Sequence, residues 1–315
     1  MNIAILGATS NIAKDLILNF VNRNPKIDIT LFARNIDDLK AWLDEKEIIN
    51  KISYIYTYES FSVKKNFDVI FNFVGIGDPA KAMKMGASII DITYIYDSLA
   101  LKYIEKNPST KYIFLSSGAA YGSKNFLTNV TKNSKSRIDI NDIKPQDWYS
   151  IAKLHAECRH RSMIDKSIID IRVFNYINSG LDLSSKFLIT DAIMAILNDQ
   201  MLITSSKNIS RDYIGPDDFY KLIMSLIAFG ECNDSVDCFT KSPIDKFSML
   251  DMLKQEFGLK YQIENNEIGL NATGKKDNYF SKNFKAKVYG YYPEYSSKET
   301  ILKELSTILK ISSIN

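Results

Sequence analysis

Residues 2–13 read Asn-Ile-Ala-Ile-Leu-Gly-Ala-Thr-Ser-Asn-Ile-Ala: an apolar run, a turn of small residues and the start of a helical pattern. The run Asn2–Leu6 has the nearly continuous apolar character of a strand that is buried on both faces. After the turn, apolar side chains recur at helical spacing, at Ile12, Leu16, Ile17 and Phe20. This order of strand, turn and helix predicts a parallel sheet covered by helices.

The same alternation continues to residue 173. Short β-branched runs predict further strands at 27–33, 52–57, 68–73, 112–115 and 168–173. Longer periodic runs predict helices at 36–42, 86–105 and 149–158. Near-continuous apolar strands separated by helices indicate a doubly wound parallel sheet, an α/β fold of the Rossmann type. The crossover connections are expected to be right-handed.

After residue 173 strands and helices no longer alternate regularly. Helices are predicted at 187–198 and 217–228, and a strand at 201–204. We therefore predict a Rossmann domain over 1–174 and a smaller cap over 175–315. Segments near 211–222 and 235–240 are expected to return to the main sheet.

The stretch 122–147 differs from its surroundings because it is rich in Lys, Asn and Ser. Such a composition between a strand and a helix is typical of a surface connection. We expect a mobile surface segment with little core of its own.

Composition and charge exclude several classes of protein. With 45% hydrophobic and 24% charged residues, the 315-residue chain has the balance of an ordinary soluble globule, large enough for an α/β unit with a smaller partner. Its net charge of +3, without a dense run of Lys or Arg, is not typical of a nucleic-acid-binding protein. No apolar run of about 18 residues occurs, so neither a signal peptide nor a membrane span is predicted.

Cysteine and histidine usage argues against a metal site. The three cysteines, Cys158, Cys232 and Cys238, form no C-x-x-C pair, and His155 and His160 are the only histidines. A zinc ion would therefore have too few ligands, and we predict no metal. The same cysteine usage fits a reducing compartment, which favours a cytoplasmic location.

The turn after the first strand has the position of a dinucleotide-binding turn. In a Rossmann fold this turn, with the helix N-terminus that follows it, presents backbone N–H groups to a pyrophosphate. The candidate cofactor contacts are Gly7, Thr9, Ser10, Asn11 and Ile12. Of a G-x-x-G-x-x-G pattern only Gly7 is kept, with Ser10 and Ala13 as small substitutes, so the segment by itself also fits a plain strand-to-helix turn.

The end of the second strand bears on the choice of cofactor. NAD-selective folds place Asp or Glu there to bind the ribose 2′-hydroxyl, whereas a basic residue accepts the 2′-phosphate of NADP. Here the strand ends Leu31-Phe32-Ala33-Arg34-Asn35, without a carboxylate. The guanidinium of Arg34 suits a phosphate, which favours NADP(H) over NAD(H); the alternative is a solvated Arg at a strand end.

A catalytic pair is predicted on the helix after the polar stretch. Tyr149 is the only one of the 18 tyrosines with a Lys four residues later, Lys153, and this spacing puts both on one helix face. The spacing alone is weak evidence, because Lys is frequent in this chain. A neighbouring ammonium favours the tyrosinate and makes the phenol useful as an acid or base near neutral pH. Hydroxyls of Ser116 and Ser117 follow strand 112–115, at the carboxyl edge of the sheet where α/β folds bind ligands.

With these features in this order, the sequence resembles the extended short-chain dehydrogenase/reductase family, and within it the nucleotide-sugar epimerases, dehydratases and reductases. The resemblance extends over most of the chain and is clearer before residue 220. Four segments carry it: Phe73-Val74-Gly75, Leu115-Ser116-Ser117-Gly118-Ala119-Ala120-Tyr121-Gly122, Arg172-Val173-Phe174-Asn175 and Arg211-Asp212-Tyr213-Ile214-Gly215-Pro216-Asp217-Asp218. The last is similar to the family's Arg-Asp-(Phe/Tyr)-Ile-x-x-x-Asp signature and is the most specific match.

The resemblance implies roles for the matched residues. Ser117, identified by counting back from Tyr121-Gly122, would be catalytic together with Tyr149 and Lys153, and these last two would also contact the cofactor. Phe73, Val74 and Gly75 would lie beneath the cofactor. Ser117, Asn175 and Arg211 would bind substrate, the last two at its diphosphate, so 175–315 would be mostly a nucleotide-sugar-binding domain. By analogy with the family, helices 86–105 and 149–162 would form a homodimer interface.

The resemblance also ranks the possible reactions. Family dehydratases carry an Asp-Glu pair directly after the catalytic Ser or Thr, where this chain has Gly118-Ala119, so dehydration is disfavoured. Arg34 favours NADPH and net reduction. We expect an NADPH-dependent reductase of a nucleotide-activated keto sugar, such as an NDP-4-keto-6-deoxy-hexose, in surface polysaccharide precursor synthesis. The alternatives are an NAD-dependent nucleotide-sugar epimerase and a non-catalytic NAD(P)-sensing regulator.

Overall fold

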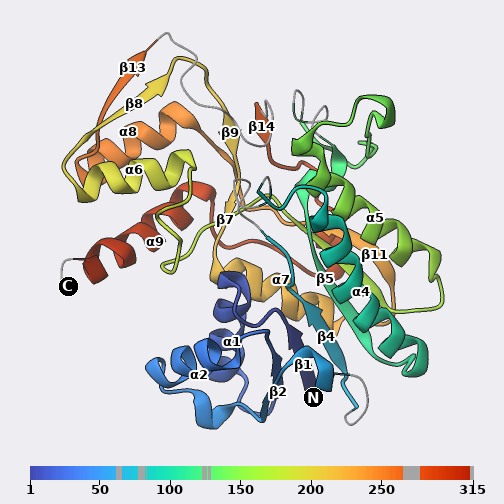
Figure 1. Ribbon diagram of the computed structural model, residues 1–315. Helices are drawn as coiled ribbons and strands as arrows, with labels where there is room; N and C mark the ends of the chain where they lie inside the picture. Colours follow the sequence, from blue (N-terminus) through green and yellow to red (C-terminus); the bar gives the residue numbers. More distant parts are fainter. Residues whose placement is uncertain are drawn as a thin grey trace.

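The computed structural model describes residues 1–61, 66–76, 82, 84–122, 126, 129–264 and 277–312. A seven-stranded sheet with helices on both faces forms the larger unit, and helices with short strands form a smaller one (Figure 1). The predicted doubly wound α/β fold with a smaller, mainly C-terminal unit is therefore confirmed. Within the described ranges, no helix combines the length and the apolar character that crossing a membrane requires.

All strands of the main sheet are parallel. Their bounds are Asn2–Leu6 (β1), Asp28–Phe32 (β2), Tyr54–Tyr56 (β3), Val69–Asn72 (β4), Lys111–Ser117 (β5), Ile168–Val173 (β6) and Asn233–Asp237 (β11). They lie in the order β11-β6-β5-β4-β1-β2-β3. Leu6 is in register with both Phe32 and Asn72, so β1, β2 and β4 end at the same level.

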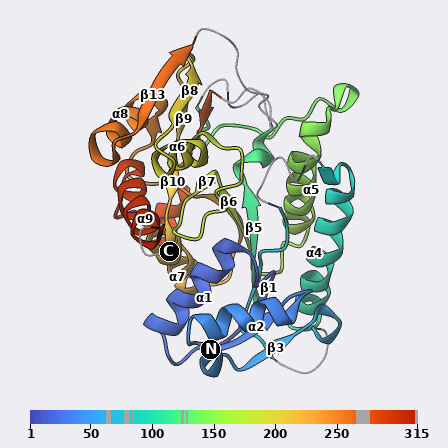
Figure 2. The same cartoon turned by 60° about the vertical axis from the view of Figure 1, so that its left-hand side comes forward.

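Two layers of helices enclose the sheet (Figure 2). One face is covered by α1 (Asn11–Arg23), α2 (Ile36–Glu45) and α7 (Pro216–Ala228), and the other by α4 (Ser88–Lys106) and α5 (Trp148–Ser162). Leu16, Phe20 and Phe219 belong to the core on the first face. Ile104 and Ala156 belong to the core on the second. Apolar burial on both faces explains why the strands show no alternation of polar and apolar residues.

The smaller unit has a core of its own. It contains α6 (Leu188–Leu197), β8 (Met201–Ser205), α8 (Lys246–Phe257), β13 (Lys260–Glu264) and α9 (Ser297–Ser312). Short strands lie between it and the main sheet: β7 (Asn175–Tyr176) pairs with β10 (Tyr213–Ile214), and β9 (Ser210–Arg211) pairs with β12 (Ile244–Asp245) and β14 (Asn278–Tyr279). The domain boundary at residue 174 stays a prediction.

Most described residues of 122–147 are exposed or half-buried, but the stretch contributes two side chains to a buried cluster that it shares with other segments. Phe126 and Val130 are fully buried, and the ring centroid of Phe126 lies 4.7 Å from that of Tyr279 and 6.2 Å from that of Phe174. The local composition does not reveal this, because the cluster is assembled from distant segments of the chain. Residues 123–125 and 127–128 of the stretch lie outside the described residues.

The turn after β1 requires glycine at position 7. Gly7 has a φ of +77°, and a Cβ there would lie 2.7 Å from both the carbonyl carbon of Phe73 and the amide nitrogen of Val74. Ser10 then caps α1, because its hydroxyl oxygen accepts the N–H of Ala13 at 3.3 Å. The backbone therefore turns tightly against the end of β4 and enters the helix at the sheet edge.

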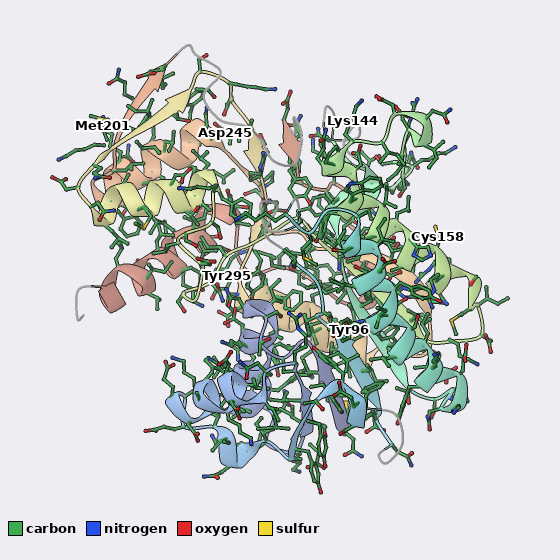
Figure 3. The ribbon with its side chains drawn as sticks, viewed as in Figure 1. Tyr96, Lys144, Cys158, Met201, Asp245 and Tyr295 are labelled. Carbon is green, nitrogen blue, oxygen red and sulfur yellow. The ribbon has the colours of Figure 1, made fainter. Side chains whose placement is uncertain are left out.

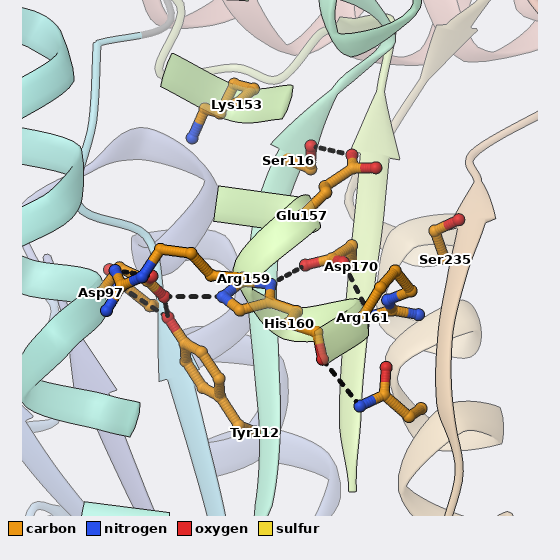
Figure 4. Close-up of polar contacts among 12 residues, drawn as sticks. Asp97, Tyr112, Ser116, Lys153, Glu157, Arg159, His160, Arg161, Asp170 and Ser235 are labelled. Carbon is orange, nitrogen blue, oxygen red and sulfur yellow. Dashed lines mark hydrogen bonds and ion pairs between the residues drawn. The ribbon is translucent and has the colours of Figure 1, made fainter. Parts of the chain in front are cut away.

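A chain of buried charges holds α5 in place. The imidazole of His160 on α5 lies between two carboxylates, with Nε2 2.7 Å from Asp97 on α4 and Nδ1 2.6 Å from Asp170 on β6 (Figure 4). None of these three side chains is exposed. Arg159 pairs with Asp97 at 2.6 Å and Arg161 with Asp170 at 2.8 Å, so each carboxylate has a second cationic partner. The ion pairs connect α5 to both α4 and the sheet.

The surroundings of His160 decide its charge. Burial alone disfavours the imidazolium, but the two flanking carboxylates outweigh burial and raise the pKa of His160 to about 9. The side chain is therefore protonated at neutral pH. Since Asp97, His160 and Asp170 lie on three different elements, no local sequence pattern predicts this cluster.

Replacing Gly7 by alanine should destabilise the protein more than the same change at another left-handed glycine. Gly258 has a similar φ of +72° but open space where a Cβ would stand, so Gly258→Ala should cost only the backbone strain of about 1 kcal/mol. Gly7→Ala adds a clash with the Phe73–Val74 backbone, and we expect a further loss of about 1–3 kcal/mol. Urea denaturation of both variants measures the free energies of unfolding. Equal losses would contradict the packing argument.

His160 should contribute stability that depends on pH. Its pKa rises from the ordinary 6.5 to about 9 on folding, so the contribution is complete below about pH 6.5 and is lost as the pH rises through about 9. We expect His160→Gln to lower the free energy of unfolding by about 3 kcal/mol near pH 6, because two carboxylates lose the charge between them, and by clearly less near pH 10. Urea denaturation at both pH values measures the difference.

His155 provides the matched control, because it is the only other histidine and is exposed on the same helix. His155→Gln should leave stability nearly unchanged at both pH values. A deficit of His160→Gln that is the same near pH 6 and near pH 10 would rule out a protonated His160.

Candidate active site

The predicted site residues gather where the parallel strands end. Gly7, Arg34 and Phe73 follow β1, β2 and β4, whose last residues are in register. Ser117 ends β5. Since carboxyl ends of neighbouring parallel strands share one edge, residues from four separate segments of the chain come together.

The Gly7 turn and the start of α1 fit the pyrophosphate of a dinucleotide. The N–H of Ala13 is used by the cap at Ser10, and that of Lys14 by the carbonyl of Ser10. Within the part of the chain that the structure describes, the N–H groups of Asn11 and Ile12 have no such partner, as expected of groups that a ligand can take. The absence of a Cβ at Gly7 keeps the turn close to β4.

The other predicted contacts of this turn are placed differently. Thr9 is exposed at its tip. The side-chain amide of Asn11 donates to the carbonyl of Gly180 at 2.9 Å, so this side chain connects the turn to the chain entering the smaller unit. The hydroxyl oxygen of Ser10 accepts in the helix cap, and its backbone N–H donates to the carbonyl of Gly7 at 3.0 Å, so the hydroxyl hydrogen is the group that Ser10 can offer a ligand.

Arg34 is exposed at the end of β2, next to a tyrosine that sequence reasoning missed. The hydroxyl of Tyr58 accepts the N–H of Gly7 at 3.1 Å. Burial raises the pKa of Tyr58 to about 12, and the positive charge of Arg34 opposes that rise. The ring of Tyr58 packs on Tyr96 of α4, with centroids 4.6 Å apart (Figure 3 labels Tyr96). Tyr58 follows β3, and no spacing in the sequence relates it to Gly7.

The two serines at the end of β5 have different partners. Ser116 donates to Glu157 at 2.5 Å, and Glu157 is also paired with Arg172. The hydroxyl oxygen of Ser117 accepts the N–H of Ala119 at 3.2 Å and lies 3.1 Å from the hydroxyl of Tyr279. Ser116 is thus bound into the ion-pair network, whereas Ser117 faces the site.

Tyr149 is half-buried on α5 and interacts with Ser117. Burial raises its pKa, and hydrogen bonding to the Ser117 hydroxyl opposes the rise. This shift is opposite to the one expected from the neighbouring Lys153, because burial outweighs the other influences. The phenol is neutral at physiological pH, the state from which it can donate a proton.

Lys153 is buried one helical turn after Tyr149. Its ammonium donates to the carbonyl of Leu115 at 2.7 Å and lies 5.9 Å from the centroid of the Tyr149 ring. A Cβ built on Gly75 would come within 3.4 Å of the ammonium nitrogen, so the segment after β4 passes beside it. Burial lowers the pKa of Lys153 to about 8.

The predicted substrate residues lie on the short strands beside the sheet. The amide of Asn175 donates to the carbonyls of Asp212 at 3.1 Å and Tyr279 at 3.3 Å. Arg211 pairs in register with Tyr279 between β9 and β14, and its guanidinium donates to the carbonyl of Ser210 at 2.8 Å. Burial lowers the pKa of Arg211, and the nearby groups of Tyr213, Tyr279 and Asp277 oppose this fall.

Tyr279 joins the two halves of the site, and the sequence contains no signal for it. It is one of 18 tyrosines and stands 162 residues after Ser117, in no motif. Through it β14, which pairs with β9, contacts the end of β5. Among the described residues, no group of three or more His, Cys, Asp or Glu side chains has the arrangement of a metal site.

Comparison with known proteins assigns the chain to a family. The sequence profile of the NAD dependent epimerase/dehydratase family matches residues 3–237, which is 235 of the 315 residues. No curated protein sequence matches the chain.

Solved structures share the fold over nearly the whole chain. UDP-glucose 4-epimerase from Thermotoga maritima with UDP-glucose is 17% identical, with a TM-score of 0.77 and 99% of each chain covered. UDP-glucuronic acid 4-epimerase from Bacillus cereus in complex with NAD is 16% identical, with a TM-score of 0.75 and coverage of 99% of this chain and 100% of that one. RMD from Pseudomonas aeruginosa complexed with NADPH is 16% identical, with a TM-score of 0.70 and coverage of 98% of this chain and 99% of that one.

The family resemblance expected from the four sequence segments is confirmed by the profile match. The matched range includes the Gly7 turn, Ser117, Tyr149, Lys153 and Arg211. The chain belongs to the NAD dependent epimerase/dehydratase family and is an NAD(P)-dependent enzyme of the extended short-chain dehydrogenase/reductase type.

Proposed function

We propose that this enzyme is an NADPH-dependent reductase of a nucleotide-activated keto sugar. The observation that carries the proposal is the exposed guanidinium of Arg34 at the end of β2, beside the Gly7 turn. An NAD-selective fold has a carboxylate at this strand end, whereas a cation suits the 2′-phosphate of NADPH. A phosphorylated dinucleotide that binds in its reduced form and leaves oxidised fits net reduction better than a reaction in which one bound cofactor is reduced and reoxidised within each turnover.

The proposed roles of the catalytic residues follow from their protonation and contacts. Reduction of the ketone carbon uses the hydride that a bound nicotinamide supplies. The alkoxide that develops needs a proton, and Tyr149, which burial keeps neutral, donates it. The hydroxyl of Ser117 donates a hydrogen bond to the same oxygen. The ammonium of Lys153 faces the segment at Gly75, where it would hold the nicotinamide ribose and favour the tyrosinate that remains.

The proposed substrate class rests on Arg211 and Asn175. Arg211 brings a half-buried cation to β9, and a diphosphate supplies the matching negative charge. The similar structures include complexes with UDP-glucose and with NADPH, which supports a nucleotide sugar and a dinucleotide as the two ligands. Directly after Ser117 the chain has Gly118-Ala119, which can neither donate nor accept a side-chain proton, so the proposal excludes dehydration.

An NAD-dependent nucleotide-sugar epimerase is the second candidate, because two of the similar structures are 4-epimerases.

We also infer a homodimer through α4 and α5. These helices pack side by side on the outer face of the sheet, and Tyr94 and Ile95 of α4 are about half exposed there, at 48% and 53%.

Removing the guanidinium of Arg34 should weaken NADPH binding selectively. We expect Arg34→Ala to raise the Kd for NADPH roughly 10- to 100-fold, because one or two charge-assisted hydrogen bonds are lost. The Kd for NADH should stay within about twofold. Fluorescence titration measures both. Lys260→Ala, which removes an exposed cation on β13, is the control. An NADH preference in the unmodified protein, or NAD retained through purification, would favour the epimerase.

Removing the phenolic hydroxyl of Tyr149 should abolish proton donation without disturbing cofactor binding. With a panel of nucleotide-activated 4-keto sugars, we expect Tyr149→Phe to lower turnover by roughly 10²- to 10⁴-fold at an unchanged Kd for NADPH. Loss of NADPH fluorescence measures turnover. Tyr261→Phe, whose hydroxyl contacts Asp251 in the smaller unit, is the control. NADPH binding without oxidation by any sugar of the panel would point to a sensing regulator.

A further inference from the structure

A chain of buried hydrogen bonds leads from the charge cluster on α5 to the segment that follows β4. Its middle members are Asn72, the last residue of β4, and Tyr112 of β5, with 1% and 0% of their surfaces exposed. The hydroxyl of Tyr112 donates to a carboxylate oxygen of Asp97 at 2.8 Å (Figure 4). The side-chain amide of Asn72 donates to the Tyr112 oxygen at 2.9 Å, and its carbonyl oxygen accepts the N–H of Val74 at 3.0 Å.

The direction of each hydrogen bond in this chain is fixed from both ends. A backbone N–H can only donate, so the atom of Asn72 that faces Val74 is the carbonyl oxygen, and the amide nitrogen faces Tyr112. At the other end, Asp97 is paired with the guanidinium of Arg159 at 2.6 Å, and a carboxylate can only accept. The hydroxyl hydrogen of Tyr112 is therefore directed at Asp97, and the Tyr112 oxygen accepts from Asn72. Both ends require the same arrangement.

The Val74 N–H lies in the segment on which the proposed cofactor site is built. A Cβ at Gly7 would lie 2.7 Å from the backbone of Phe73 and Val74, so this backbone limits how close the dinucleotide turn comes to β4. Gly75 follows, beside the ammonium of Lys153. The N–H of Phe73 still donates to the end of β1. For the N–H of Val74, the partner within the described residues is the Asn72 side chain.

The carboxylate of Asp97 selects the orientation of the Asn72 amide. An asparagine amide has two orientations of nearly equal shape, which exchange its oxygen and its nitrogen. In the reverse orientation, N–H groups of Asn72 would face the Val74 N–H, and its oxygen would face the oxygen of Tyr112, whose hydrogen is used by Asp97. Two pairs of buried polar groups would then lack a shared hydrogen bond, which is strongly unfavourable away from water.

We propose that Asn72 and Tyr112 are positioning residues, which connect the buried Asp97 carboxylate with the Val74 N–H and so fix the backbone that follows β4. The consequence for binding rests on the proposed function, in which a dinucleotide lies over this segment; the consequence for the segment itself does not. Neither side chain touches the cofactor in this proposal, because both are buried within the sheet.

Amide hydrogen exchange of Val74 tests the positioning without any ligand. Full-length protein labelled with ¹⁵N-valine reports the exchange by NMR, and the spectrum of Val74→Ile assigns the signal. Asn72→Leu keeps the approximate size of the side chain but offers no acceptor. We expect it to speed exchange at Val74 roughly five- to tenfold, the worth of one neutral hydrogen bond. Exchange at Val69, inside β4, should change less than about twofold, because the strand pairing there is kept.

Tyr112→Phe removes the connection to the carboxylate and keeps the ring. The Asn72 amide then lacks its acceptor, and exchange at Val74 should speed up about two- to fivefold. The double variant should exchange like Asn72→Leu alone, because Tyr112 acts through Asn72. Tyr103→Phe is the matched control: Tyr103 belongs to the same buried core, but its hydroxyl accepts the N–H of Phe67 at 2.9 Å. This change should leave exchange at Val74 as it is in the unmodified protein.

Three results of the exchange measurement would overturn the proposal. They are unchanged exchange at Val74 in Asn72→Leu, additive effects in the double variant, and equal acceleration at Val69 and Val74, which a general loss of stability explains. If Asn72→Leu does not fold, Tyr112→Phe decides against Tyr103→Phe alone, because phenylalanine keeps the ring contact of Tyr112 with His160. Equal exchange at Val74 in these two variants would then contradict the positioning role.

Dinucleotide binding separates this inference from the proposed function. With NADPH or NADH, whichever the unmodified protein binds, Asn72→Leu should raise the Kd about tenfold and Tyr112→Phe about threefold, because a looser segment has to be ordered on binding. Tyr103→Phe should leave the Kd within about twofold. If neither dinucleotide binds the unmodified protein, the proposed function fails, while exchange at Val74 still decides the positioning. Faster exchange at Val74 with an unchanged Kd would overturn the consequence for binding.

Discussion

Seven parallel strands ending at one edge are the constraint on which the site depends. Because β1, β2 and β4 end in register, the Gly7 turn, Arg34 and Phe73 become neighbours although they are far apart in the chain. The approach is close enough that the backbone of Phe73 and Val74 occupies the place of a side chain at position 7. The helix that starts behind this turn offers N–H groups to an anion, so an anion site follows from topology as much as from the residues of the turn.

The orientation of α5 is the second requirement, and buried charges provide it. Glu157 pairs with Arg172 of β6, and His160 is held between Asp97 and Asp170. Buried ion pairs gain little net stability, because desolvation offsets attraction, but they tolerate few alternative arrangements. A helix held by apolar contacts alone can rotate or slide at small cost. The charge network gives α5 one register against the sheet, and we infer that this register sets the positions of Tyr149 and Lys153.

The sheet and α5 supply only part of the site, and the smaller unit supplies the rest. Asn175 and Arg211 lie on short strands beside the sheet, and β14 brings Tyr279 to Ser117. The proposed substrate contacts are thus hydrogen-bonded to the same strand that contacts Ser117. In this arrangement, Tyr279 connects the short strands to the end of β5.

The sequence determined what short-range patterns encode. Continuous apolar runs between helical patterns predicted the doubly wound fold, the 7–12 turn and Arg34 were found by their places after strands, and Tyr149 and Lys153 by their spacing of one helical turn. The roles of Tyr58, His160 and Tyr279, and the buried Phe126 within a polar stretch, were decided only by the tertiary structure. Each depends on partners that folding brings from distant elements, such as Gly7 for Tyr58 and Ser117 for Tyr279. Local composition and spacing report a residue's neighbours along the chain, whereas burial, hydrogen bonding and pKa depend on its neighbours in space.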